Sequence, residues 1–193
     1  MSGLTLKIIF MVFWFATGII RYPHSQRQKK NQIRTDNKSG LEKLLLAIVS
    51  LGMLILPVLF VITPLLDFAN YELPTGLSIV GIVLIPISLW LFYKSHKDLG
   101  RNWSPSLEVT TEHTLITEGV YKHIRHPMYS AIWLWVIIQA LLLHNYIAGP
   151  AGMVTFALLY FLRVDVEENM MLQEFGDSYA NYIKRSGRLF PKF

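Results

Sequence analysis

Long apolar runs separated by short polar stretches dominate the pattern of this chain. A helix that crosses a bilayer needs roughly 20 consecutive apolar residues. Five runs predict membrane-spanning helices, over Leu4–Ile20, Leu44–Leu66, Leu77–Tyr93, Met128–Leu143 and Ile147–Leu162. The last two runs are short and closely spaced, which predicts a helical hairpin that returns the chain to the side it left. We therefore predict an all-α, polytopic integral membrane protein.

Three prolines interrupt the second and third runs. Pro57 and Pro64 fall in the second run and Pro86 falls in the third. Proline removes a backbone donor and clashes with the preceding turn, so Pro57 and Pro64 should kink the second helix or mark its end. The first run follows a single Lys7, and no small-residue cleavage site comes after it. We expect a retained helix here instead of a signal peptide.

Lysine and arginine lie almost entirely on one side of the predicted helices. The loop 21–43 holds seven, the segment 94–125 holds five and the tail from residue 163 holds five, whereas Lys7 alone lies on the other side. Because basic residues are retained in the cytosol, this predicts an outside N-terminus and a cytosolic C-terminus. The loop 21–43 lacks interleaved aromatic residues, so we expect it to contact anionic membrane lipids and not nucleic acid.

Composition narrows the chemistry further. Of the 193 residues, 52% are hydrophobic and 16% are charged, which is too apolar for a soluble domain of this size. The chain contains no cysteine, which excludes disulfides, Cys-ligated metal centres and a cysteine nucleophile. His113, His123 and His126 do not have the spacing of a metal site, and no phosphate-cradling glycine motif occurs. We therefore expect one membrane-embedded domain that binds no metal.

Two segments on the predicted cytosolic side are richer in polar side chains than topology requires. The first is Lys94–Tyr129, in which Pro127 disfavours the α conformation at His126 and suits a first helical turn. His126 should therefore stand at the entrance of a helix, where free N–H groups favour an anion. Tyr121 and Tyr129 add donors and flat aromatic faces. A plain helix start with interfacial tyrosines would account for the same residues.

The second segment, Arg163–Phe193, begins with a basic and an acidic residue one helical turn apart. Arg163 and Glu167 share a helix face, and an exposed pair of this kind is worth under about 1 kcal/mol. The alternative is that an arginine at headgroup depth holds a substrate anion. Apolar side chains over residues 170–183, broken at Gly176, predict two short amphipathic helices. Because both segments emerge on the same face, we expect them to form one pocket.

Five blocks of sequence stand out within these two segments. They are His113-Thr-Leu-Ile116, Gly119-Val-Tyr121, Arg125-His-Pro-Met-Tyr129, Arg163-x-x-x-Glu-Glu168 and Phe175-Gly-Asp-Ser-Tyr179. Their order and spacing resemble the isoprenylcysteine carboxyl methyltransferase family. The resemblance implies a methyltransferase catalytic region over residues 94–193, with a cofactor loop, the helical hairpin and amphipathic C-terminal helices. Residues 1–93 would then supply three N-terminal transmembrane helices and a basic cytosolic loop.

The resemblance also implies a cytosolic-face pocket for S-adenosyl-L-methionine. The residues at the family's cofactor-binding positions are His113, Thr114, Leu115, Ile116, Tyr121, His126, Pro127, Met128 and Tyr129. Arg163 and Glu167 match its substrate-binding and catalytic positions. Ser106 departs from the family, which carries a cofactor-contacting glutamine there. The implied reaction methylates a lipid-linked or small hydrophobic acceptor, with the C-terminal carboxylate of an isoprenylcysteine-like substrate as the leading choice.

Other functions are compatible with parts of the pattern. Phospholipid amine and small-thiol methyltransferases share the Arg-His-Pro-x-Tyr and Glu-Glu elements but act on other acceptors. Membrane sterol reductases have a related C-terminal cofactor region but use NADPH and are much larger. A non-enzymatic transporter or scaffold should carry polar residues in mid-span or internal repeats, and this sequence shows neither.

Overall fold

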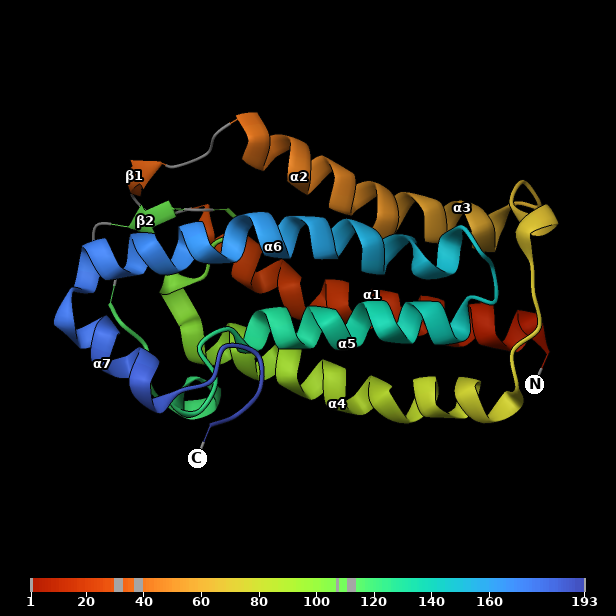
Figure 1. Cartoon of the computed structure of the whole chain (residues 1–193). Helices are drawn as coiled ribbons and strands as arrows, with labels where there is room; N and C mark the ends of the chain where they lie inside the picture. The colour runs from red at the N-terminus through yellow and green to blue at the C-terminus, as the bar shows by residue number, and fades with distance from the viewer. Residues whose placement is uncertain (1, 30–32, 37–39, 107, 111–113, 193) are drawn as a thin grey trace.

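Long helices run side by side along one common axis in the computed structural model of this chain (Figure 1). The structure describes residues 2–29, 33–36, 40–106, 108–110 and 114–192. The α-helices are α1 (Gly3–Gln28), α2 (Gly40–Ser50), α3 (Leu56–Ile62), α4 (Thr75–Leu99), α5 (Pro127–Leu142), α6 (Ala148–Phe175) and α7 (Asp177–Arg185). Short connecting helices are η1 (Leu51–Ile55), η2 (Asp67–Ala69), η3 (Gly100–Asn102) and η4 (Gly119–Lys122).

Within the described residues, four helical stretches are long and apolar enough to cross a membrane. They cover Gly3–Gln28, Gly40–Ile62, Thr75–Asn102 and Ala148–Phe175. The fourth predicted span corresponds to α5, which is apolar but only 16 residues long. These helices confirm the prediction of an all-α, polytopic membrane protein.

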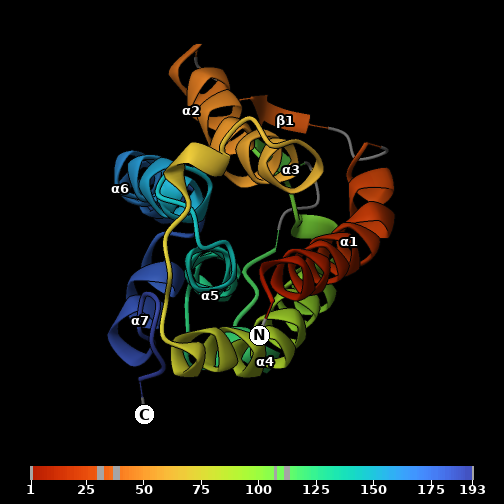
Figure 2. The ribbon, with the colours of Figure 1, turned by 90° about the vertical axis from the view of Figure 1, so that its right-hand side faces the viewer.

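The short helix α5 occupies the centre of the bundle. Seen along the bundle axis, α1, α3, α4 and α6 surround it (Figure 2). Side chains on several faces of α5 are buried, including Ala131, Val136 and Ile138, as expected for a helix that is apolar all round. Trp135 packs against Phe10 and Phe13 of α1, with ring centroids 5.6 and 5.7 Å apart. Since α5 packs on protein, its length does not have to match the bilayer.

The second predicted span differs in detail from the expectation. It begins at Gly40 and ends at Ile62, because Thr63 takes an extended conformation before Pro64. Just before Pro57 the helix widens into the π-helical turn η1, in which the N–H of Leu56 bonds to the carbonyl of Leu51. The two prolines therefore mark an irregular turn and the helix end, as their chemistry predicts.

Helix α6 corrects the predicted organisation of the C-terminal segment. We expected a span ending near Leu162 followed by two amphipathic helices, but α6 continues without a break to Phe175. No helix-breaking residue lies between its first turn and Gly176, where φ is +51° and the helix ends. Arg163 and Glu167 consequently stand on the same rigid helix as the membrane span, and only α7 is a separate amphipathic helix.

A two-stranded sheet joins two loops that the sequence analysis treated separately. Strand β1 (Ile33–Asp36) pairs antiparallel with β2 (Glu108–Thr110), with Thr35 opposite Val109. Neither strand was predicted, since each is too short to show an alternating pattern. The pairing ties the basic loop between α1 and α2 to the loop that follows α4, at the end of the bundle that also holds α7 (Figure 1).

Candidate active site

A cavity of about 500 Å³ opens among the helices at this end of the bundle. Its volume lies in the range typical of sites that enclose a small organic ligand. Both polar segments singled out in the sequence contribute to its wall. The predicted site residues that line it are Thr114, Leu115, Ile116, Tyr121, His126, Met128, Tyr129, Arg163 and Glu167.

Two other predicted site residues do not line the cavity as described. Pro127 is buried as the first residue of α5, where it fixes the start of the helix below the site. His113 lies outside the described residues. The structure therefore brings together all but these two of the residues expected to bind ligand.

The loop that carries Tyr121 is anchored on the end of α4. Asp98 accepts a hydrogen bond from the N–H of Val120 at 3.0 Å and forms an ion pair with Lys94 at 3.0 Å. Gly119 has φ +59°, and a Cβ at this position would lie 2.1 Å from Asp98 Oδ2. Only glycine fits this conformation so close to the carboxylate.

A second anchor holds the loop residues 114–116 against the cavity. The side chain of Asn102 donates to Thr114 Oγ1 at 3.0 Å and accepts from the Thr114 N–H at 3.1 Å. Nearby, Ser106 is buried in the cavity wall, at the position where the family resemblance led us to expect a longer glutamine. These two hydrogen bonds fix the backbone at Thr114, in the part of the loop that lines the cavity.

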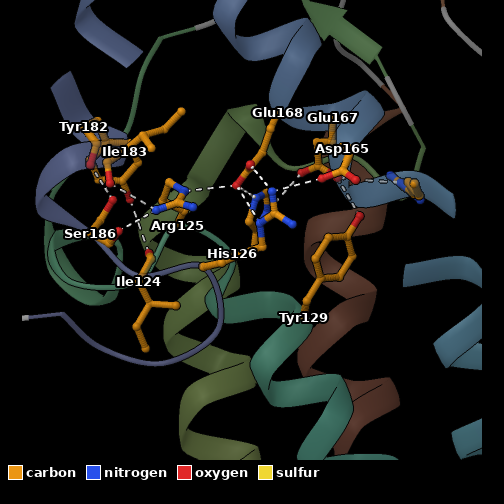
Figure 3. Close-up of polar contacts among 12 residues, drawn as sticks. Ile124, Arg125, His126, Tyr129, Asp165, Glu167, Glu168, Tyr182, Ile183 and Ser186 are labelled. Atoms are coloured by element: carbon orange, nitrogen blue, oxygen red, sulfur yellow. Dashed lines mark hydrogen bonds and ion pairs between the residues drawn. The ribbon is translucent and has the colours of Figure 1, made fainter. Parts of the chain in front are cut away.

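His126 bridges two adjacent carboxylates of α6 (Figure 3). Its Nε2 lies 3.1 Å from Glu168 Oε1, and its Nδ1 lies 3.6 Å from Glu167 Oε1. Burial by itself would lower the pKa of His126, but the hydrogen bonds and charges of the two glutamates outweigh it, and the pKa is raised. The ring stacks on Tyr129, and its backbone has left the α region before Pro127, as predicted.

Glu167 is held at the cavity surface by three neighbours. The hydroxyl of Tyr129 donates to its Oε2 at 2.5 Å, and the imidazole of His126 faces its Oε1 (Figure 3). The Nε of Arg163 lies 3.7 Å from Oε2, which is an ion pair but not a hydrogen bond. Since Tyr129 is itself buried against Tyr160, this carboxylate has little freedom to turn.

The guanidinium of Arg163 is anchored through Nη1. The side that carries Nε makes no hydrogen bond to a described residue, and we call it the open edge. The Nη1 of Arg163 donates to the carbonyl of Pro105 at 3.0 Å and lies 3.1 Å from Glu42 Oε1. Its buried Nε has no hydrogen-bond partner among the residues that the structure describes. Arg163 is 8% exposed, so an unsatisfied donor here is costly unless a ligand completes it.

Arg125 clamps the helices behind His126. It is part-buried, and its Nε donates to Glu168 at 3.0 Å while Nη1 donates to the carbonyls of Ser186 and Ile183 (Figure 3). The backbone N–H of His126 donates to the carbonyl of Arg188 at 3.0 Å. The segment that follows α7 is therefore hydrogen-bonded to the backbone just before α5. This pairing fixes the position of the His126 imidazole.

Tyrosines form the remaining polar wall of the cavity. The hydroxyl of Tyr182 donates to the carbonyl of Tyr121, and Tyr121 donates to the carbonyl of Ser95 at 3.3 Å. Burial is the main cause that raises the pKa of Tyr121 well above its ordinary value and the pKa of Tyr182 to about 12. Both phenols are therefore neutral and contribute flat aromatic faces to the cavity.

Comparison with known proteins gives a consistent family. Residues 77–173 match the model of the isoprenylcysteine carboxyl methyltransferase family. A protein-S-isoprenylcysteine O-methyltransferase B of Arabidopsis thaliana is 30% identical over 138 residues, which cover 70% of each chain. This chain belongs to the isoprenylcysteine carboxyl methyltransferase family.

Two further family relatives define how far the likeness extends. The Homo sapiens protein-S-isoprenylcysteine O-methyltransferase is 31% identical over 113 residues, which cover 58% of this chain and 40% of the human one. A solved eukaryotic intramembrane Ras methyltransferase superposes with a TM-score of 0.60 at 22% identity, covering 98% of this chain and 71% of that chain. That superposition shows that the fold is shared, including the first two spans, which carry no recognisable sequence signature.

Three residues of this family member's site were missed by sequence reasoning. Glu42 stands in the first turn of α2 and touches Arg163, although it lies inside a loop that the charge pattern marks only as basic. Arg125 stood out only as the first residue of the Arg125-His-Pro-Met-Tyr129 block, and no role was predicted for Asn102. Their partners lie between 12 and 121 residues away along the chain, so spacing could not reveal them.

Proposed function

We propose that this protein is an S-adenosyl-L-methionine-dependent methyltransferase that esterifies the C-terminal carboxylate of an isoprenylcysteine-like, membrane-associated acceptor. One observation carries the proposal beyond family membership. His126 and Tyr129 from the first polar segment, and Arg163 and Glu167 from the second, line the same cavity. A loop with cofactor-type residues and an arginine with an open edge therefore face one another across a space of ligand size.

The cavity fits the cofactor chemically. Residues 114–116 and Tyr121 offer backbone and aromatic surfaces for an adenosine group, and Glu167 offers a carboxylate near which a sulfonium cation is favoured. When bound, S-adenosyl-L-methionine supplies a methyl group on a cationic sulfur. His126 and Tyr129 hold Glu167 in place, so its carboxylate would favour binding of the cofactor in its sulfonium form.

The acceptor is positioned by Arg163 and by the apolar part of the same cavity. That part is lined by side chains of α1, η1, α5 and α6, including Trp14, Met53, Trp135 and Phe156. The hydrocarbon chain of the acceptor can lie there while the open edge of Arg163, which carries Nε, binds the acceptor carboxylate. Glu167 orients Arg163, because its Oε2 lies 3.7 Å from that Nε.

The reaction gains from the enclosed position of these groups. With the cofactor bound, transfer of its methyl group to the acceptor carboxylate held by Arg163 would yield an ester and a thioether and would release no proton. Opposite charges disappear in the transition state, so exclusion of water favours it over the solvated reactants. Alignment of the two reactants by Arg163 and the cofactor loop supplies the rest of the acceleration.

The proposal places the site on the cytosolic face, with the N-terminus outside. The described parts of loop 21–43, the segment after α4 and the C-terminal tail, which are rich in lysine and arginine, lie at the end of the bundle that holds the cavity (Figure 1). In this arrangement residues 94–193 form the catalytic region and residues 1–93 the three N-terminal helices and a basic loop.

Two measurements on the purified protein in nanodiscs test the proposal. Isothermal titration should detect binding of S-adenosyl-L-methionine, and labelled methyl transfer should be faster to a farnesylcysteine analogue than to an ethanolamine lipid or methanethiol. Absence of cofactor binding would refute the assignment. Transfer to the lipid amine or the thiol instead of the carboxylate would keep the methyltransferase and change the acceptor.

A further inference from the structure

The first turn of α2 places one carboxylate against Arg163. Glu42 is 4% exposed, although it stands among lysines and arginines in the sequence. Its Oε1 lies 3.1 Å from Nη1 of Arg163, which is also buried. Topology alone would place this residue in the headgroup region, so its burial against Arg163 needs a different explanation.

Arg163 is therefore shared between two carboxylates of the protein itself. Glu42 contacts its Nη1, and Glu167 faces its Nε at 3.7 Å. An acceptor carboxylate that binds the open edge is attracted by one guanidinium and repelled by both glutamates. Because these groups are largely removed from water, solvent and salt weaken the attraction and repulsion between them only a little.

Strong binding of the acceptor carboxylate would slow its methylation. The negative charge of the acceptor disappears in the transition state, so an arginine stabilises the free carboxylate more than the transition state. Binding energy that is larger in the ground state lowers KM and also lowers kcat. A protein carboxylate that partly neutralises the arginine weakens its binding of the free acceptor carboxylate and so reduces this loss of rate.

We propose that Glu42 is a tuning residue that weakens the hold of Arg163 on the acceptor carboxylate and thereby raises the rate of methyl transfer. The inference rests on the proposed function, in which Arg163 binds that carboxylate. Glu42 acts only through Arg163 and touches no reacting atom. Its effect should be confined to anionic acceptors, because a neutral ester has no charge for Arg163 or Glu42 to act on.

Glu42→Gln in the full-length protein tests this inference through the sign of the change. With S-adenosylhomocysteine present to prevent turnover, the dissociation constant of farnesylcysteine carboxylate should fall about tenfold. The dissociation constant of its methyl ester should stay within about twofold, because the ester lacks the charge. In steady-state assays kcat for the carboxylate should fall as well. Glu72→Gln, which removes an exposed carboxylate between α3 and α4, should change none of these quantities.

A merely structural role for Glu42 would give a different pattern. Loss of packing or of helix position would raise the dissociation constants of carboxylate and ester together. An unchanged or increased dissociation constant for the carboxylate would overturn the inference, even if kcat falls.

A second variant covers the case in which Glu42→Gln does not fold. Glu42→Asp keeps the charge but withdraws it from Arg163 by about one carbon–carbon bond length, roughly 1.5 Å. The dissociation constant of the carboxylate should shift in the same direction by a smaller factor, and no shift would again overturn the inference. If the wild type does not methylate the carboxylate at all, the proposed function itself fails, which separates that outcome from a failure of the tuning role.

Discussion

At the scale of single residues, the open edge of Arg163 is the feature on which acceptor binding depends. Its Nη1 is engaged by Pro105 and Glu42, whereas its buried Nε has no hydrogen-bond partner among the described residues. An anchored arginine with free donors presents a planar fork to an incoming carboxylate. Lysine cannot reproduce that fork, although it keeps the charge.

Replacement of Arg163 should separate catalysis from cofactor binding. We expect Arg163→Ala to lower kcat/KM for the acceptor by at least about 100-fold, because the acceptor is no longer aligned. Isothermal titration should show that affinity for S-adenosyl-L-methionine changes little. Arg163→Lys should recover only part of the rate. Equal losses of cofactor affinity and turnover would contradict an acceptor-binding role.

His126 gives the fold a pH dependence of known sign. Its pKa is raised in the folded protein, mainly because the carboxylates of Glu167 and Glu168 overcome the effect of burial. The stabilisation is therefore fully present below the unfolded-state pKa of 6.5 and is lost as the pH rises through the folded-state value. The wild-type Tm in detergent should fall with rising pH in this range.

The matched variant His126→Gln should be less stable than the wild type at about pH 6 and should lose less stability as the pH rises. It should also weaken cofactor binding, because Glu167 loses one of the neighbours that hold it. Parallel curves of Tm against pH for the two proteins would show that His126 is not the titrating group.

At this scale most of the residues predicted from the sequence line the cavity, but few of their partners were predicted. Pro127 made the conformation of His126 predictable, because proline restricts the residue before it. Family blocks then gave the side chains that we expect to bind ligand. In contrast, the contact between Glu42 and Arg163 depends on the packing of α2 against α6, which no local pattern encodes.

At the scale of helices, the contact between the α2–η1–α3 stretch and α6 is unusually close. A Cβ on Gly52 would lie 2.2 Å from Thr155 Oγ1 and 2.6 Å from the carbonyl oxygen of Ala151. The carbonyl of Gly52 also accepts a hydrogen bond from the buried side chain of Gln139 on α5. Small residues at such positions allow membrane helices to approach one another.

Gly52→Ala should therefore force these two helices apart. We expect a loss of about 1–3 kcal/mol in the free energy of unfolding, because backbone atoms cannot move aside as a side chain can. Gly76→Ala is the matched control, since a Cβ there meets no atom within 4 Å. Thermal unfolding in the same detergent compares the two variants, and equal midpoints would show that the helices adapt without cost.

Helix boundaries were predictable only where a residue enforces them. Pro64 and Gly176 end their helices by restricting or permitting backbone conformations, and both ends were anticipated. The continuation of α6 to Phe175 was not, because hydropathy falls where the helix leaves the membrane although the helix itself does not stop. The π-helical form of η1 was also not predicted, since Pro57 indicates an irregular turn or a helix end without specifying its type.

At the scale of the whole molecule, the proposed orientation follows from charge and can be tested directly. The chain has no cysteine, so a single introduced thiol is the only one present. We expect Tyr146→Cys, in the exposed turn between α5 and α6, to react with an impermeant maleimide on intact cells. Lys122→Cys, on the cavity side, should react only after the membrane is opened.

The reverse labelling pattern would invert the orientation and place the cavity on the outer face. The presence of five apolar stretches and their common axis would be unaffected, since hydropathy determines the spans and basic loops determine only the side. The global arrangement was thus predictable in outline, whereas the central place of α5 required the packing of all its neighbours.

The unbroken course of α6 also links the reaction to the thickness of the lipid bilayer. A helix of 28 residues is about 42 Å long, whereas the hydrocarbon core measures about 30 Å. The chain therefore sets the height of Arg163 above the turn at Tyr146, but lipid acyl-chain length sets the level of the headgroups around it. Hydrophobic mismatch in thin or thick membranes should then change how easily a lipid-anchored acceptor reaches the guanidinium.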